Sequence, residues 1–247
     1  MKYTISFIFL ILFIGCSNNN NNNSNNTCSN RFDFIASTDT IPVLKFDVKT
    51  PYYLARKDIS DLYYNDDLCK HCSRIEFKIP FDIENKDGTL KVMTDYDYPY
   101  CQECPIPNRF REYYRINIYT KNRLYVEDKT ISLDSLPSNI ETYLQSIGKN
   151  KIAPESFSKV NYLIDWQQGV NQKFLDTILK KITKAHLKNV ERLVNESNRD
   201  FCSLDKEELM KLKRKYPLQI EFDLGKSEKM HEIIYQNYKY KVENNSL

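Results

Sequence analysis

The sequence predicts an α+β protein: a β-rich N-terminal region with a long hairpin, followed by an α/β two-layer region with two helices on one sheet. Three observations predict this class. Apolar and polar residues alternate on both sides of residues 85–88, and apolar residues recur at helical spacing in two later segments. The chain also contains 18 tyrosines and 13 phenylalanines against five glycines, which favours strands rich in aromatic side chains.

The N-terminus has the pattern of an export signal at residues 1–15. Lys2 precedes an almost entirely apolar run at residues 3–14, which is too short to cross a bilayer because a spanning helix needs about 20 residues. The run ends in Gly15 and Cys16, and this ending resembles the lipobox of bacterial lipoproteins. The resemblance implies cleavage before Cys16, a diacylglyceryl group on its sulfur and a fatty acid such as palmitate on its new amine. The alternative is an ordinary secretory signal in which Cys16 is incidental.

Residues 16–30 are expected to form a lipid anchor and a disordered, asparagine-rich tether, because so few apolar groups cannot offset the entropy lost on ordering. Ser17 is not the aspartate that retains lipoproteins of enterobacteria in the inner membrane, so the resemblance favours the outer membrane, facing the periplasm. Beyond the tether we expect a β-rich, cysteine-containing domain at residues 31–107, an α/β domain at 108–198 and a C-terminal extension at 199–247.

Residues 75–83 and 90–98 are expected to form a long amphipathic hairpin. Pairing Asn85 with Gly88 across the turn keeps the apolar faces of the two strands together. This register places Ile83 opposite Leu90, Phe81 opposite Val92 and Phe77 opposite Tyr96. Pro80 has no N–H, so its strand should lie at an edge of the sheet or have its outward side unpaired.

Six of the seven cysteines remain once Cys16 is assigned to lipid, and an even number in an oxidising compartment favours disulfides. Four of them form two C-x-x-C pairs, which the hairpin register places opposite each other. The expected disulfides are Cys72–Cys101, Cys69–Cys104 and, by elimination, Cys28–Cys202. A zinc site with Cys69, Cys72, Cys101 and Cys104 as ligands is the main alternative. Local bridges within each C-x-x-C pair are a further alternative.

The second half predicts alternating strands and helices. Residues 114–119 and 124–126 read as short strands, and residues 136–147 as a helix with Pro137 in its first turn and Gly148 at its C-terminal cap. A strand at 160–165, a helix around 174–182 and a strand at 189–194 complete the region. Further strands are expected at 43–48 and 52–54, and the C-terminal extension predicts a helix at 204–215 and a strand at 218–224.

Residues 115–145 (RINIYTKNRLYVEDKTISLDSLPSNIETYLQ) and 160–194 resemble the periplasmic domain of the ExbD/TolR biopolymer-transport proteins. The resemblance covers about residues 110–196 and consists of apolar positions and one aspartate. It implies a domain that dimerises and binds an envelope protein partner or peptidoglycan. The matching positions are Ile116, Ile118, Leu124, Tyr125, Val126, Leu136, Leu144, Asp165, Val170, Ile178 and Val190.

The chain also departs from that family. Family members have an N-terminal transmembrane helix with a membrane-embedded acid that couples proton flow to force, whereas this chain has the predicted lipid anchor and a β-rich region instead. It therefore cannot carry that proton. The family's usual turn glycine is also absent at residues 121–123.

Enzymatic signatures are weak in this sequence. The three histidines, His71, His186 and His231, are far apart, and there is no Ser/His/Asp signature, glycine-rich phosphate loop or H-E-x-x-H sequence. Asp165 is the best lone candidate for an acid or base, although a carboxylate at a strand end more often bonds the following turn. The 36 basic and 33 acidic residues are interspersed, which does not favour nucleic acid.

We therefore expect a non-enzymatic envelope lipoprotein without a cofactor that binds a periplasmic protein partner or peptidoglycan in support of envelope transport or integrity. The alternative is a zinc-binding or thiol-redox lipoprotein that acts through its C-x-x-C pairs.

Overall fold

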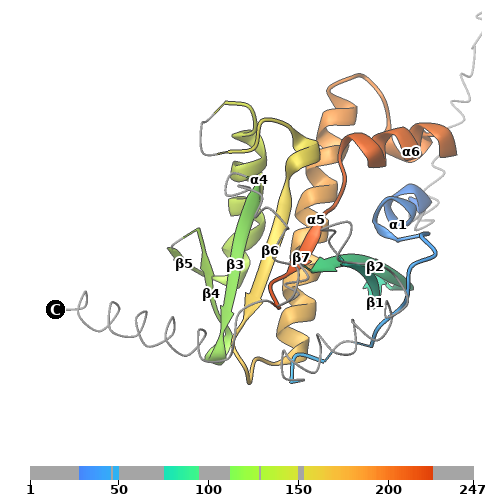
Figure 1. Ribbon diagram of the computed structural model, residues 1–247. Coiled ribbons are helices and arrows are strands. Elements are labelled where there is room, and N and C mark those ends of the chain that lie inside the picture. Colours follow the sequence, from blue (N-terminus) through green and yellow to red (C-terminus); the bar gives the residue numbers. More distant parts are fainter. Residues whose placement is uncertain are drawn as a thin grey trace, which may run out of the picture.

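The computed structural model describes residues 28–45, 47–49, 75–94, 112–127, 129–149 and 153–224 (Figure 1). Within these ranges the protein is α+β, as predicted, with four α-helices and a mixed seven-stranded sheet. The helices are α1 (Ser29–Ile35), α4 (Leu136–Gln145), α5 (Gln172–Asn195) and α6 (Lys206–Lys215). The strands are β1 (Ile75–Ile83), β2 (Lys86–Thr94), β3 (Tyr113–Tyr119), β4 (Arg123–Val126), β5 (Lys129–Ile131), β6 (Asn161–Trp166) and β7 (Ile220–Phe222). The short 3₁₀ turns are η1 (Thr120–Asn122), η2 (Leu133–Ser135), η3 (Phe157–Lys159) and η4 (Phe201–Ser203).

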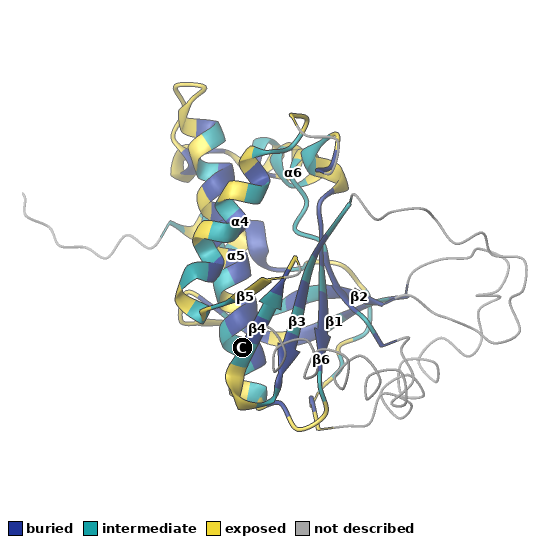
Figure 2. Ribbon diagram, turned by 90° about the vertical axis from the view of Figure 1, so that its left-hand side faces the viewer, coloured by how far each residue is buried: buried dark blue, intermediate teal, exposed yellow. Residues whose placement is uncertain are grey.

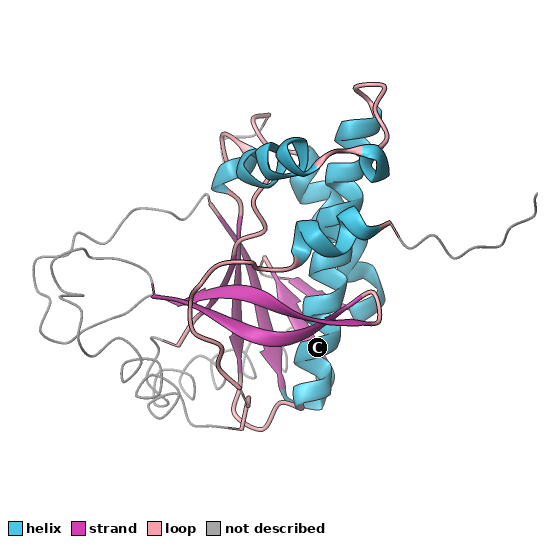
Figure 3. Cartoon of the chain, turned by 90° about the vertical axis from the view of Figure 1, so that its right-hand side faces the viewer, coloured by secondary structure: helices cyan, strands magenta, loops and turns pink. Residues whose placement is uncertain are grey.

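The strand order in the sheet is β1-β2-β7-β6-β3-β4-β5. The central strands β2, β7, β6 and β3 run parallel to one another, and the pairs nearer the two edges are antiparallel. Figures 2 and 3 view the sheet from opposite sides and show α4 and α5 together on one of its faces. The prediction of two helices on one sheet is therefore confirmed.

The sheet combines strands from the three regions that the sequence analysis treats separately. β1 and β2 come from residues 31–107, β3 to β6 from 108–198 and β7 from 199–247. β7 lies between β2 and β6, where its Phe222 ring packs edge-on against Trp166 of β6 at 5.1 Å and Phe77 of β1 at 6.2 Å. One core of aromatic and aliphatic side chains thus joins the hairpin to the rest of the protein.

The hairpin forms, but the predicted register is wrong. Phe77 pairs with Val92 instead of Tyr96, a shift of four residues, and Ile83 pairs with Lys86. The turn is Glu84 and Asn85, both with positive φ (50° and 64°). Two such residues are typical of the two-residue type I′ turn, whose twist matches that of antiparallel strands. Because the shift is an even number of residues, the apolar face of each strand is still buried.

Gly88 explains the error in register. It lies within β2 and not in the turn, and a Cβ atom at this position would come within 3.2 Å of the Phe32 ring and of Ile83. The glycine therefore makes room for an aromatic ring from α1, a long-range reason that the local sequence does not reveal. The predicted pairing of Cys72 with Cys101 and of Cys69 with Cys104 rested on the wrong register, and all four cysteines lie outside the described residues.

The edge position predicted from Pro80 is confirmed, because β1 is the first strand of the sheet. Lys78, two residues earlier, turns its backbone away from β2: its N–H donates to the Pro42 carbonyl and its carbonyl accepts from Leu44. Pro80 has the same orientation as Lys78. Its missing N–H therefore costs no bond between β1 and β2.

The strand predicted at residues 189–194 is wrong, because α5 continues as one helix to Asn195. Val190 and Val194 are buried in the last turns of α5, and their i, i+4 spacing is that of a helix. The strand that completes the sheet after α5 is instead β7, within the predicted strand 218–224. It follows α6, which lies within the predicted helix 204–215.

The N-terminal strap, residues 28–45 and 47–49, runs from α6 past the hairpin to the start of α5 (Figure 1, blue). Ser37 N–H donates to the Thr89 carbonyl, and Val48 N–H donates to the Gln172 side chain. The strand predicted at 43–48 is reduced to one bridge between Val43 and Lys78, and the strand predicted at 52–54 lies outside the described residues. The strap is thus hydrogen-bonded both to the hairpin and to the first residue of α5.

Candidate functional site

Most of the candidate residues chosen from the sequence lie outside the described part of the chain. These are Cys16 with the whole lipobox, the two C-x-x-C pairs, His71 and His231. The remaining candidates are Cys28, Cys202, Asp165 and His186.

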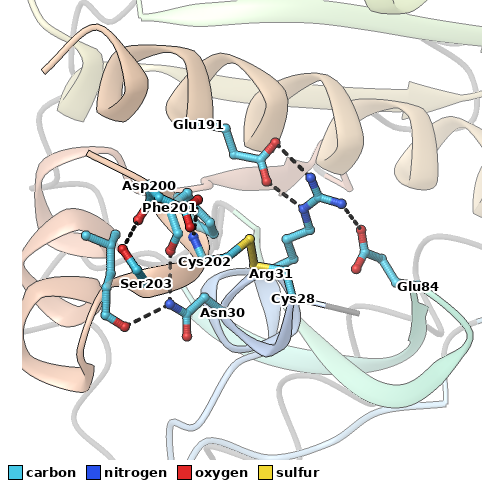
Figure 4. Close-up of a disulfide and its surroundings, with 10 residues drawn as sticks. Cys28, Asn30, Arg31, Glu84, Glu191, Asp200, Phe201, Cys202 and Ser203 are labelled. Atoms are coloured by element: carbon cyan, nitrogen blue, oxygen red, sulfur yellow. Dashed lines mark hydrogen bonds and ion pairs between the residues drawn. A yellow bond between two sulfur atoms is a disulfide. The ribbon is translucent and has the colours of Figure 1, made fainter. Parts of the chain in front are cut away.

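Cys28 and Cys202 form a disulfide, with Cα atoms 5.3 Å apart (Figure 4). This distance is within the range of about 4.4–6.8 Å that disulfides require. The bond joins the residue before α1 to η4, which precedes α6. Asn30 strengthens the connection, because its side-chain amide donates to the carbonyls of Phe201 (3.0 Å) and Leu204 (2.8 Å).

Arg31 ties α1 to two further elements. Its Nε lies 2.6 Å from Oε1 of Glu191 on α5, and its Nη2 lies 3.4 Å from the other oxygen of the same carboxylate. A second carboxylate, that of Glu84 in the hairpin turn, lies 3.8 Å away. The disulfide, Asn30 and Arg31 therefore anchor the beginning of the described chain firmly on the protein body (Figure 4).

His186 is a buried structural residue. It lies on the core side of α5, where the Tyr162 hydroxyl is 3.1 Å from Nδ1 and the Tyr216 carbonyl oxygen is 3.2 Å from Nε2. A carbonyl only accepts, so Nε2 carries the proton and Nδ1 accepts from the tyrosine. Burial lowers the pKa of His186 to about 4, although the bond to Tyr216 opposes the shift. The ring is therefore neutral at pH 7 and connects α5, β6 and the segment before β7.

Asp165 does not form an acid–base pair with His186. Side chains alternate along β6, so Tyr162, Ile164 and Trp166 face the helices whereas Asp165 faces the other side of the sheet. Glu221 of β7 is on that same side and is almost fully buried, and its carboxylate accepts from the Asn161 amide at 2.5 Å. This buried pair could not be predicted from the sequence, because no local pattern joins residues that are 60 positions apart.

A groove of about 470 Å³ lies beside the strap and is the candidate binding site. Four parts of the chain form its walls: residues 34–39, the neighbouring strands β1 and β2, the C-terminal part of α6 and residues 216–220. Its volume is within the range of about 300–1,000 Å³ that is usual for ligand pockets. The apolar lining residues are Phe34, Ile35, Ala36, Met93, Met210, Tyr216, Pro217, Leu218 and Ile220.

Charged side chains surround this apolar surface. Lys91 lies 2.8 Å from Glu76 and 3.2 Å from Asp39. Burial opposes its charge, but the bonds to both carboxylates outweigh that effect and raise the pKa of Lys91. Lys213 donates instead to the backbone carbonyls of Asp33 and Ala36, each at 2.9 Å, and burial lowers the pKa of Lys213.

No known protein family, no curated protein and no solved structure matches this chain. Within the described ranges, no group of three or more histidine, cysteine, aspartate or glutamate side chains is placed to hold a metal ion. None of the helices in that part of the chain is long and apolar enough to cross a membrane.

Proposed function

We propose that this chain is a non-enzymatic, lipid-anchored protein of the bacterial cell envelope that binds a periplasmic protein partner. Cys16 carries the lipid, and the asparagine-rich segment before Cys28 tethers the α+β body to the outer membrane on its periplasmic side. Residues 28–30, which were expected to belong to the disordered tether, are instead part of the ordered body, since Cys28 forms the disulfide and α1 begins at Ser29. The protein acts as an accessory to envelope transport or integrity. Peptidoglycan is the alternative partner.

One observation carries this proposal, the attachment of α1 to the body by the disulfide between Cys28 and Cys202. Disulfides persist in oxidising compartments such as the periplasm, which supports export. The bond lies where the tether meets the ordered body, so any pull from the lipid anchor reaches the body through Cys28 and η4. In a protein pulled by its anchor, a covalent bond at this position keeps the strap attached to the body.

The ExbD/TolR-like reading is the finer part of the proposal. Apart from the additional strand β5 between β4 and α4, the order β3, β4, α4, β6, α5 agrees with the family pattern, and α4 and α5 lie on one face of the sheet. Lys121 and Asn122 adopt positive φ (63° and 56°) at the turn where the family has glycine. The helical end of α5 departs from the pattern, because the family has a strand there. Dimerisation, which the resemblance implies, is included in the proposal.

The buried polar groups favour binding over catalysis. His186 is neutral between two structural partners, and Asp165 lies on the opposite side of the sheet. A zinc-binding or thiol-redox function through Cys69, Cys72, Cys101 and Cys104 is the alternative, and it rests on the sequence alone. The metal content and free-thiol count of the purified chain separate this alternative from the proposal.

Photo-crosslinking in living cells tests partner binding. A photoreactive residue is placed singly at three exposed positions on different faces: Met210 in the groove, Lys129 on β5 and Lys173 at the start of α5. We expect an adduct with one specific envelope protein from at least one position, unchanged after muramidase digestion. Adducts that muramidase removes would indicate peptidoglycan instead. The absence of adducts at every position would contradict the proposal.

A further inference from the structure

The groove beside the strap has the surface of a peptide-binding site. Met210 lies on its apolar surface and is 40% exposed although it is large and apolar, whereas Met93, which also lines the groove, is 7% exposed. Methionine side chains are flexible and polarisable, and they recur on surfaces that bind varied apolar partners. An apolar side chain from outside could therefore cover Met210.

Part of the groove lies at the edge of β2 that faces away from β1. Along this edge Met93 pairs with Glu221 of β7, and the carbonyl of Thr89, four residues earlier, accepts from Ser37 of the strap. Lys91 lies between these two contacts and lines the groove together with Met93 and Ile220. A strand edge of this kind is where an extended peptide segment can add to a sheet.

The charges at the groove are not balanced. Lys91 lies between the carboxylates of Glu76 and Asp39, so these three groups together carry one negative charge. Lys213 has no carboxylate partner among the described residues; it bonds two carbonyls at the end of α1, and an ammonium group has three donors. Arg214 is exposed and likewise forms no ion pair with a described residue. The nearby carboxylates of Asp33 and Asp39 favour the charged form of Lys213, although they form no ion pair with it. Arg214 is therefore the exposed cation of the groove that lacks a carboxylate partner among the described residues.

We propose that this groove binds an extended, acidic peptide segment of the protein partner, with an apolar side chain against Met93 and Met210 and a carboxylate at Arg214. An arginine guanidinium can hold a carboxylate through two parallel hydrogen bonds, which fixes the position of the peptide as well as its charge. The inference rests on the proposed function, and it names the site and the partner chemistry that the proposed function leaves open.

A peptide selection with two matched variants tests it. A displayed library of random twelve-residue peptides is selected on the full chain in detergent, and the enriched peptides are synthesised for affinity measurement. Arg214→Glu is compared with Lys215→Glu, which makes the same charge change in the same turn of α6 at a residue that does not line the groove. We expect enriched peptides with one or more acidic residues beside apolar ones. Arg214→Glu should weaken their binding at least tenfold and Lys215→Glu less than threefold, and Met210→Ala should also weaken it.

Three results would overturn the inference: no enriched peptide, enriched peptides without an acidic bias, or equal effects of the two charge reversals. These results are distinct from failure of the proposed function. If crosslinks to an envelope protein form from Lys129 or Lys173 but peptides do not bind the groove, the binding function stands and its site lies elsewhere. If both fail, the proposed function fails as well.

Discussion

Cys28 and Cys202 are joined by a disulfide although they are 174 residues apart in the sequence. The bond holds the start of α1 against η4, and the Asn30 amide donates to two carbonyls of the same segment. It therefore closes a loop that contains every described helix and strand except α6 and β7. Crosslinks that close long loops limit the unfolded chain most strongly in the loop-entropy view.

Removing this disulfide should destabilise the protein. We expect the double variant Cys28→Ser/Cys202→Ser to lose about 2–5 kcal/mol of unfolding free energy, as is usual for native disulfides. Urea unfolding followed by circular dichroism measures the loss. The double variant avoids a lone thiol that could pair with another cysteine, and the wild type under reducing conditions is the control. A midpoint equal to that of the oxidised wild type would show that the bond does not form.

Protonation of His186 should make the protein sensitive to mild acid. Burial lowers its pKa in the folded state from 6.5 to about 4. Below pH 6.5 the unfolded chain therefore binds a proton that the folded protein does not. The stability that this histidine contributes is complete above pH 6.5 and is lost as the pH falls towards 4. Between pH 7 and pH 5 the loss is about 2 kcal/mol.

Comparison with His186→Gln checks the assignment. Glutamine can still hydrogen-bond but does not titrate, so the variant should lose less unfolding free energy between pH 7 and pH 5 than the wild type. Urea unfolding at several pH values gives both curves. If the unfolding free energies of the wild type and of His186→Gln changed equally with pH, another group would cause the pH dependence.

A side chain at Gly88 should be costly because it would meet the Phe32 ring and Ile83. We expect Gly88→Val to destabilise the protein by about 1 kcal/mol, the low end of the usual cost of overpacking, because Gly88 and Phe32 are both partly exposed and the ring can shift. Asp87→Val is the matched control, since Asp87 is the exposed neighbour on the same strand. Thermal unfolding of both variants measures the difference. If Gly88→Val were as stable as Asp87→Val, Gly88 would not pack against Phe32, and the explanation given for the register would be wrong.

The elements that local periodicity determines could be predicted from the sequence. The pattern of Leu136, Ile140 and Leu144 predicts α4, and the alternation of Tyr162 and Ile164 predicts β6. The hairpin strands were also found, but their register depended on the contact of Phe32 with Gly88, which joins segments far apart in the chain. Local propensity carries no information on such contacts.

The sheet order and the candidate site could not be predicted for the same reason. β7 has three residues and is placed between β2 and β6 only by its long-range partners, among them Trp166 and Phe77 around Phe222. The groove is lined by segments far apart in the sequence, such as those of Phe34 and Ile220, so no local motif predicts it. The mistaken strand at 189–194 came from reading a short apolar window without the rest of α5.

The central claim is that Cys16 anchors this protein to the cell envelope through lipid. Growth of bacteria with radiolabelled palmitate, followed by mass spectrometry of the N-terminal peptide, tests it most directly. For the wild type, the account predicts a labelled chain that begins at Cys16 and carries the mass of the attached acyl groups. Cys16→Ala should be unlabelled and unprocessed. An unmodified Cys16 in the wild type, or equal labelling of Cys16→Ala, would contradict the account.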